Sequence, residues 1–363
     1  MFRLLRVSAL LSRTRSGLTP PLSHRRFSAC ASNDELISSG LRAVAERRYN
    51  DAISLFEKSM DARVSSQFNS ETNQLVESTT TATADPQYVL HHVFVYNNVG
   101  EAHRLAGSFT EAKAALMRAL NLFDKLPLDV KHAEKLIRSS ALNNLGLVYI
   151  DMLQPKDAIP HLLQSVGLRL ELGDAADAAT VYNNLGLAYS HDSQFALSRK
   201  AYNEALEIVR HLKANPNSEV DVQSKRADKQ LVGEVYLLGN LGLLGIHEKK
   251  YEEALATLHL AEGMIEQDPR SMSGPDYASV LNNIALACFY LKKYNRSHEY
   301  YSRAIALFEA SLGQYHPRLY SVYVNFATLC GKMKGSERTK EGREAAMKAK
   351  AIAERILTKQ PER

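Results

Sequence analysis

The stretch YNNLGLAY at residues 182–189 decides the fold, because nearly the same letters occur three more times. The related stretches are YNNVGEAH at 96–103, LNNLGLVY at 142–149 and LNNIALAC at 281–288. With the small residue of each copy as an anchor, the pattern extends to seven copies, anchored at Gly40, Gly100, Gly146, Gly186, Gly242, Ala285 and Ala327. Successive anchors are 60, 46, 40, 56, 43 and 42 residues apart. Self-similarity at such a period indicates a tandem array of one structural unit.

Each copy has the spacing of two helices. In the copy at 182–189, Tyr182, Leu185, Gly186 and Tyr189 fall at i, i+3, i+4 and i+7, on one face of an α-helix. Nine residues after the anchor there is usually an aromatic residue, and small residues follow at twelve and nineteen. These positions predict a second helix whose small residues face the first. Because one pair cannot bury both apolar stripes alone, successive pairs are expected to stack.

This pattern of Leu-Gly, Tyr, aromatic-x-x-Ala and a later Ala resembles the tetratricopeptide repeat (TPR) over residues 34–358. The spacing near 42, the repeated NNL-G/A and the LGQYHP at 312–317 look most like the kinesin-light-chain subtype. The resemblance implies an all-α fold, a right-handed superhelical solenoid of about seven helix-turn-helix repeats with a C-terminal capping helix. It implies less about function, because TPR arrays serve many processes.

Shifts in composition predict the domain organisation. We expect a cleaved presequence at 1–27, a first helical pair at 34–62, a Ser/Thr-rich linker at 63–87, the TPR array at 88–330, the last half-repeat with the capping helix at 331–358, and a tail at 359–363. A second polar interruption lies at 213–230. Each interruption is a modification site, a docking loop or a tolerated surface insertion. In the last helix, Ala345, Ala349, Ile352 and Ile356 form an apolar stripe, as an end cap requires.

The basic excess of the chain lies in its N-terminal leader. Residues 1–27 contain six arginines and no acidic residue, so their removal changes the formal net charge from +5 to −1. The rest of the chain therefore lacks the electrostatic footprint of a nucleic-acid-binding protein. The leader is Arg- and Ser-rich and amphipathic, which is typical of a mitochondrial presequence. Arg25, Phe27 and Ser28 resemble a matrix-processing site with cleavage before Ser28.

We therefore expect a mitochondrial protein, in the matrix or at the matrix-facing inner membrane. A plastid protein and a chain whose leader is only a disordered tail are the alternatives. No stretch approaches 18 apolar residues, so no transmembrane helix is expected.

Motifs for catalysis or cofactor binding are missing from the sequence. There is no phosphate-binding G-x-x-x-x-G-K-[ST], and the glycines of LGLLG at 241–245 lie inside a helical repeat. Cys30, Cys288 and Cys330 do not have the spacing of metal ligands. Cys288 and Cys330 occupy the position of Tyr149 and Tyr189 in their repeats, so we interpret them as small core residues. We expect no catalytic residue, no cofactor and no metal.

The repeated asparagines predict a binding groove. The first Asn of each pair and the residue after each anchor lie off the packing stripe, on the side that lines the concave face. These residues are Asn97, Asn143, Asn183 and Asn282, with Leu147, Leu187, Leu243 and Leu286. A carboxamide both donates and accepts, so solvated amides could hold the backbone of an extended peptide while the leucines exclude water. This resembles how kinesin-light-chain arrays hold cargo peptides.

An architectural role is the alternative for both rows of asparagines. In this interpretation the second Asn of each pair bonds between neighbouring repeats, and these residues are Asn98, Asn144, Asn184, Asn240, Asn283 and Asn325.

From these features we expect a non-enzymatic mitochondrial scaffold or adaptor that binds an extended peptide or a partner subunit, as an assembly factor for a respiratory or other mitochondrial complex. The groove positions lack the Lys and Arg of the carboxylate clamp by which other TPR proteins hold chaperone tails. The alternatives are a permanent subunit of a large assembly and an organellar RNA-processing factor, although the near-neutral body disfavours RNA. We expect neither a nucleic acid nor a small molecule as ligand.

Overall fold

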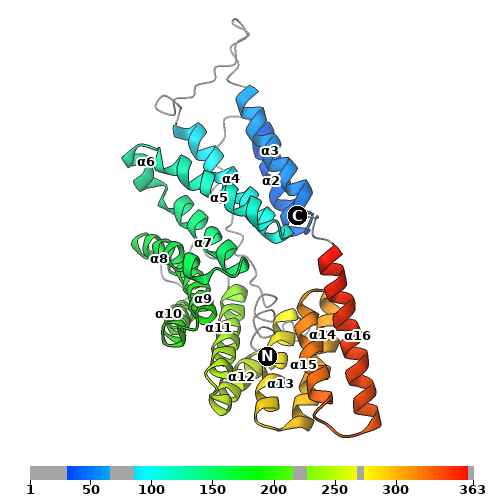
Figure 1. The fold of residues 1–363 in the computed structure, drawn as a ribbon. Coiled ribbons are helices and arrows are strands. Elements are labelled where there is room, and N and C mark those ends of the chain that lie inside the picture. The colour runs from blue at the N-terminus through cyan, green and yellow to red at the C-terminus, as the bar shows by residue number, and fades with distance from the viewer. Residues whose placement is uncertain (1–30, 66–85, 216–226, 268–273, 359–363) are drawn as a thin grey trace, which may run out of the picture. The chain divides into compact units, whose positions relative to one another are not determined.

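A computed structural model describes residues 31–65, 86–215, 227–267 and 274–358. All the regular elements in these ranges are α-helices (Figure 1). They are α2 (Ala31–Ala45), α3 (Tyr49–Ser65), α4 (Pro86–Ala106), α5 (Phe109–Asp124), α6 (Leu128–Ala133), α7 (Lys135–Asp151), α8 (Pro155–Glu171), α9 (Ala175–His191), α10 (Phe195–Ala214), α11 (Ala227–His247), α12 (Tyr251–Glu266), α13 (Pro275–Tyr290), α14 (Tyr294–Leu312), α15 (Arg318–Cys330) and α16 (Ser336–Thr358). The predicted all-α class of helix-turn-helix repeats is confirmed. The predicted presequence at 1–27 and the tail lie outside the described residues, as does most of the 63–87 linker.

The repeat pattern locates the start of the second helix in every copy. In all seven copies that helix begins at the ninth residue after the anchor, at Tyr49, Phe109, Pro155, Phe195, Tyr251, Tyr294 and Ser336. Pro155 fits this first position because a helix does not use the N–H that proline lacks there.

The turn between the two helices has a left-handed residue that the sequence analysis did not identify. The seventh residue after the anchor has a positive φ in six copies, at Arg47, Gly107, Leu153, Ser193, Lys249 and Lys292. Around Leu153, the N–H of Gln154 donates to the carbonyl of Tyr149 at 2.8 Å, which closes the end of α7. Since most of these residues are not glycine, their letters gave no sign of the conformation.

The anchor glycines bring the two helices of a hairpin into close contact. A Cβ atom added to Gly100, Gly146 or Gly242 would lie 2.5, 2.6 or 2.4 Å from the Cγ of a leucine on the second helix. Those leucines are Leu116, Leu162 and Leu258, each buried and each sixteen residues after its anchor. Glycine is therefore required at these anchors because only its missing side chain leaves room for the leucine.

The described residues form two compact units, one ending at Asp192 and the other beginning at Ser193. In the first unit, the hairpins α2–α3, α4–α5 and α7–α8 stack in chain order and α9 packs on α8. Its first helices α4, α7 and α9 also contact one another in succession. In the second unit, α10 packs on α11, and the hairpins α11–α12, α13–α14 and α15–α16 follow. Here α11, α13 and α15 form the corresponding row of first helices.

The last hairpin departs from the repeat pattern. The pattern predicts that Thr339 and Ala346 face the preceding helix, but both are exposed, and the anchor Ala327 is only half-buried. The close approach lies three residues further along each helix, where a Cβ atom on Gly342 would lie 2.9 Å from the Cβ of Cys330. The predicted apolar stripe of the cap is confirmed at its three described side chains, which are buried, namely Ala345, Ala349 and Ile352.

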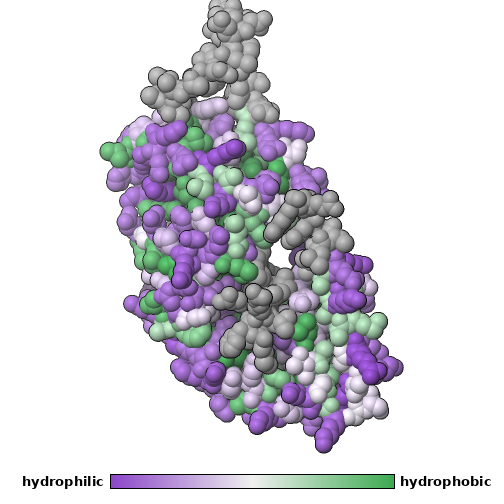
Figure 2. All heavy atoms as spheres, in the orientation of Figure 1, coloured by the Kyte–Doolittle hydropathy of each residue, from purple (hydrophilic) through white to green (hydrophobic). Residues whose placement is uncertain are grey.

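On the face drawn in Figure 2, the described residues are mostly hydrophilic, and the hydrophobic ones lie in small separate areas. The most exposed large apolar side chains include Leu128 and Met347. Among the described helices, none combines the length and apolar character needed to cross a membrane.

Candidate functional site

The repeated asparagines form a hydrogen-bonded ladder in the first unit. The amide of Asn144 donates to Oδ1 of Asn97 at 3.1 Å, and the amide of Asn184 donates to Oδ1 of Asn143 at 2.9 Å. Within a pair, the first Asn donates to the second at 3.4 Å, from Asn143 to Asn144 and from Asn183 to Asn184. Asn144 and Asn184 therefore each join their own repeat to the preceding one, as the architectural alternative predicts. Asn98 instead donates to the carbonyl of Phe94 in its own helix.

The expectation that the first-row amides are solvated is wrong for two of them. Asn97 and Asn183 are buried, with 6% and 7% of their surface exposed. Asn143 and Asn282 are half-buried. A buried amide that already bonds to its neighbours serves packing between repeats, so the physical reason for the error is the close stacking of successive first helices.

The predicted leucine row is divided in the same way. Leu147 and Leu286 are buried, whereas Leu187 and Leu243 are half-buried. In the second copy the residue after the anchor is Glu101 instead of a leucine. Glu101 belongs to a buried ion cluster.

The buried cluster around Arg104 joins α4 to α7. Arg104 contacts Glu101 at 2.8 Å and Asp151 at 3.1 Å. Burial alone would lower the pKa of Arg104, but the two carboxylates outweigh it and raise that pKa. Removing one member would leave a buried charge, so we assign this cluster to structure.

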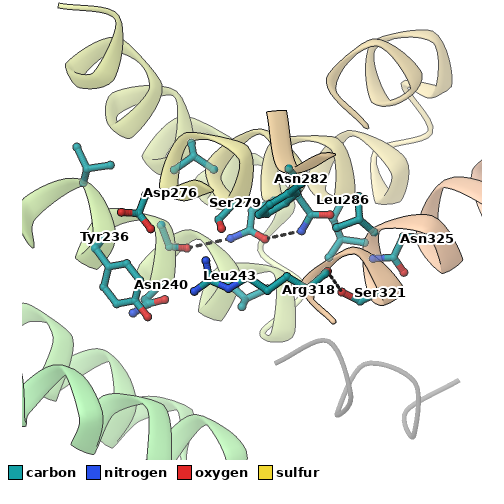
Figure 3. Close-up of a pocket in the computed structure, with 16 residues that line it drawn as sticks. Tyr236, Asn240, Leu243, Asp276, Ser279, Asn282, Leu286, Arg318, Ser321 and Asn325 are labelled. Carbon is teal, nitrogen blue, oxygen red and sulfur yellow. Dashed lines mark hydrogen bonds between the residues drawn. The ribbon is translucent and has the colours of Figure 1, made fainter. Parts of the chain in front are cut away.

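In the second unit, the first helices line a pocket that contains three of the predicted groove residues (Figure 3). These are Leu243 on α11 and Asn282 and Leu286 on α13. The remaining predicted residues, Asn97, Asn143, Asn183, Leu147 and Leu187, lie in the first unit and do not line it. The presequence residues Arg25, Phe27 and Ser28 lie outside the described residues.

Polar residues that the sequence analysis missed complete the pocket. Among the described lining residues, Arg318 is the one cation and Asp276 the one carboxylate. Figure 3 shows the side chain of Arg318 lying across the pocket. A usable signal was present, because Arg318, Ser321 and Asn325 lie at i, i+3 and i+7 on one face of α15.

The amide ladder is incomplete in this pocket. Asn283 donates to the carbonyl of Gly239 at 3.4 Å, and Asn282 donates to Oδ1 of Asn283 at 3.1 Å. The pattern of the first unit predicts that the next second-row residue, Asn325, donates to Oδ1 of Asn282. Instead that oxygen is buried and has no hydrogen-bond partner within the described residues. Asn325 instead lies beside Tyr301: burial raises the pKa of this phenol, and Asn325 offsets part of the rise.

Comparison with protein families supports the repeat assignment. Three models described as tetratricopeptide repeat match residues 95–125, 137–211 and 278–318. No curated protein matches the chain.

Solved structures share the fold at low sequence identity. The apo form of RapI is 11% identical, with a TM-score of 0.60 over 90% of this chain and 99% of its own. NprR in complex with its cognate peptide NprX is 16% identical, with a TM-score of 0.54 over 90% of this chain and 81% of its own. The repeats of a putative kinesin light chain from Podosopora anserina are 14% identical and cover 60% of this chain and 96% of theirs, at a TM-score of 0.46. That score is too low to support an argument, so the kinesin-light-chain subtype stays a prediction.

Proposed function

The chain is a tetratricopeptide repeat protein, and we propose that it acts as a non-enzymatic adaptor that holds an extended segment of a partner protein in the pocket of its second unit. The segment would place an N–H donor against Asn282 and an acidic group near Arg318, with apolar side chains over Leu243 and Leu286. An assembly role in a respiratory or other mitochondrial complex is part of this proposal.

The open acceptor of Asn282 is the observation that supports the proposal most directly. A buried acceptor without a partner costs about 1–3 kcal/mol. A backbone N–H of a bound segment would remove that cost by donating to this oxygen, and the contact would not depend on the side chains of the segment. Elsewhere in the ladder the equivalent acceptors of Asn97 and Asn143 already have donors, so the segment would bind at this rung.

The other lining residues give the pocket both polarity and a hydrophobic floor. Val280, Leu286 and Val322 supply buried apolar surface, while Arg318 and Asp276 supply opposite charges. Such a combination of a few polar groups on an apolar floor is typical of binding sites. The fold is also used for peptide binding in NprR, whose structure contains its cognate peptide.

Site-specific photocrosslinking tests the pocket. A photoreactive amino acid at Leu243, which lines it, should crosslink one defined peptide segment, identified by mass spectrometry of material from intact mitochondria. The control position is Leu260 on α12, which is 61% exposed and does not line the pocket.

A second variant checks that the crosslink reports binding. Arg318→Ala should reduce the yield at Leu243 because it removes the one cation of the described lining. Equal crosslinking at both positions, or a yield at Leu243 that Arg318→Ala does not change, would contradict the proposal.

The mitochondrial part of the proposal rests on the composition of the leader and has its own test. A fusion of residues 1–32 to a reporter should enter mitochondria, because this segment contains the six arginines and no acid before residue 28. Sequencing of the mature N-terminus should find Ser28. A reporter that stays in the cytosol would refute the targeting proposal and leave the pocket proposal standing.

A further inference from the structure

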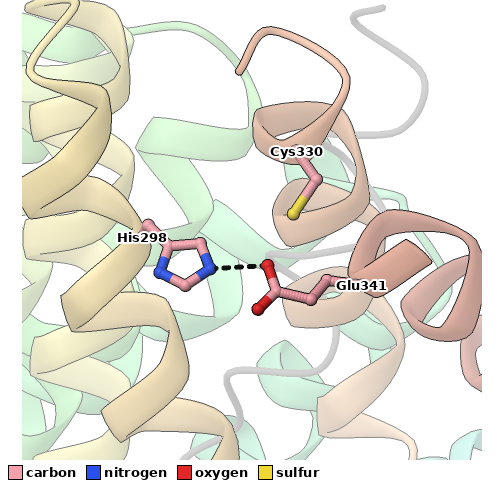
Figure 4. A group of neighbouring side chains, drawn as sticks. All are labelled: His298, Cys330 and Glu341. Carbon is pink, nitrogen blue, oxygen red and sulfur yellow. Dashed lines mark hydrogen bonds and ion pairs between the residues drawn. The ribbon is translucent and has the colours of Figure 1, made fainter. Parts of the chain in front are cut away.

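A histidine, a cysteine and a glutamate from three different helices meet at the end of the second unit (Figure 4). His298 lies on α14, Cys330 is the last residue of α15, and Glu341 lies on α16. One ligand atom from each residue lies within 4.8 Å of the other two. The residues are 32 and 11 positions apart, so no sequence spacing indicated the cluster.

The hydrogen bonds at His298 are in conflict. Its Nε2 lies 2.9 Å from the carboxylate of Glu341 and 2.8 Å from Nη1 of Arg338. The carboxylate can only accept and the guanidinium can only donate, so one ring nitrogen satisfies one of them at a time. A cation placed between His298 and Glu341 would use the lone pairs of both.

We propose that His298, Cys330 and Glu341 bind a zinc ion that fastens the capping helix α16 to α14 and α15. Imidazole, thiolate and carboxylate are all zinc ligands, and the thiolate disfavours magnesium and calcium. Three protein ligands leave the fourth tetrahedral position to water. This site is separate from the pocket of the proposed function.

The distances fit a zinc ion after small side-chain movements. With bonds of about 2.0–2.3 Å, a tetrahedral zinc ion holds its ligand atoms about 3.3–3.7 Å apart. Because Nε2 of His298 and the carboxylate of Glu341 are 2.9 Å apart and all three ligand atoms lie within 4.8 Å, shifts of about 1 Å suffice. The contact between Cys330 and Gly342 keeps the backbones of α15 and α16 close enough for this closure.

Zinc binds the deprotonated forms of Glu341 and Cys330. Burial alone would raise the pKa of Glu341, but hydrogen bonds from Arg338 and His298 outweigh it and lower that pKa, so the carboxylate is ionised at neutral pH. Burial raises the pKa of Cys330. As the sulfur–zinc bond forms, the thiol proton leaves to solvent. Arg338, whose side chain is 33% exposed, turns out into water.

Arg338 distinguishes a metal site from an ion-pair cluster. In the ion-pair interpretation Arg338 is a member that holds the cluster together, and its loss loosens the site. In the metal interpretation it is a competing cation, and its loss strengthens metal binding.

Cobalt(II) titration of the full-length chain, followed by zinc competition, tests the proposal. We expect a thiolate-to-cobalt charge-transfer band that zinc abolishes. Cys330→Ser should remove the band and weaken binding about tenfold or more, whereas Cys288→Ser, a matched change at the other buried cysteine, should leave both unchanged. Arg338→Ala should tighten binding about threefold or more.

Three results would overturn the proposal: no charge-transfer band, a band that Cys330→Ser retains, or weaker metal binding in Arg338→Ala. The last variant changes a partly exposed side chain, so it remains informative if Cys330→Ser fails to fold. Circular dichroism of each variant checks folding independently of the metal.

Discussion

Replacing Asn144 with alanine removes one complete rung of the amide ladder. Asn144 donates to the buried Oδ1 of Asn97 at 3.1 Å and accepts from Asn143 at 3.4 Å. After the substitution, the oxygen of Asn97 loses this donor in a site that is 6% exposed. Asn143 is half-buried, so its amide can turn to water.

The loss of folding stability expected for Asn144→Ala follows from these two hydrogen bonds. A buried acceptor left without its donor costs about 1–3 kcal/mol, while the long bond from Asn143 contributes little because water replaces it. Alanine is the better helix former and returns up to about 0.7 kcal/mol. The expected net loss is about 1–2 kcal/mol, a decrease in Tm of about 1–3 °C for a chain of 363 residues.

Asn98 provides a matched control at the same repeat position. Its amide donates at 2.8 Å to the carbonyl of Phe94 in its own helix, so it does not join repeats. Asn98→Ala should therefore change stability by less than about 0.5 kcal/mol. Asn144→Asp should destabilise more than Asn144→Ala, because it places two acceptors against each other.

Urea unfolding of the three variants, followed by circular dichroism, measures these differences. If Asn144→Ala and Asn98→Ala unfold alike, the ladder does not stabilise the stack. If Asn144→Asp is as stable as the unchanged protein, the assigned direction of the hydrogen bond is wrong.

Three further predictions concern glycine, pH and the open rung. Gly242→Ala should lower the free energy of unfolding by about 1–3 kcal/mol, because the added Cβ would meet Leu258. Gly107→Ala should lower it by about 1 kcal/mol, because the φ of +90° at this position disfavours a side chain. Gly263→Ala should raise it by up to about 1 kcal/mol, because this position within α12 faces open space. Any other order of unfolding midpoints would contradict these environments. Burial lowers the pKa of His247 in the folded protein. Below the ordinary histidine pKa of about 6.5, the unfolded chain therefore binds more protons at this residue than the folded chain does. The stability of the folded protein should consequently fall as the pH decreases from about 7 to 5. His247→Gln should flatten that dependence and the exposed His211→Gln should not, which unfolding at both pH values would show. Asn282→Ala should leave stability within about 1 kcal/mol, because it removes an unpaired buried acceptor together with one hydrogen bond, yet it should reduce crosslinking at Leu243; a large fall in Tm would mean that the rung is closed in the free protein.

The repeat pattern was sufficient to predict the hairpins because their letters report contacts within one copy. Gly100 and Phe109 belong to one hairpin, and the spacing between them follows from helix geometry alone. The left-handed turn residues were invisible because Leu153 and Lys249 are not residue types that favour a positive φ. The shift in the last hairpin was missed because the pattern counts from Ala327, whereas the closest approach is set by Gly342.

The candidate site was predicted only in part, since it depends on contacts between copies. Periodicity placed Asn282, Leu243 and Leu286 on the inner side of their helices, and the structure brings them into one pocket. It could not show that Asn97 and Asn183 are buried, because the exposure of one first helix depends on how closely the next one stacks. Arg318 and Asp276 were missed because both occupy the position nine residues before the anchor, which varies between copies from Ile137 and Gly233 to Asp177. A repeat pattern detects only what stays the same.

The same contrast links architecture to function in this array. A ladder in which each second Asn donates to the preceding first Asn needs both residues in every copy. The copy with Gly239 offers a backbone carbonyl in place of the first amide, and Asn283 still finds a partner there. The last copy has Val324 at the first position, and its Asn325 does not donate to Asn282, whose Oδ1 has no hydrogen-bond partner within the described residues. At this rung, the Oδ1 of Asn282 is the acceptor that the proposed partner segment would use, and Arg318 lies in the same pocket.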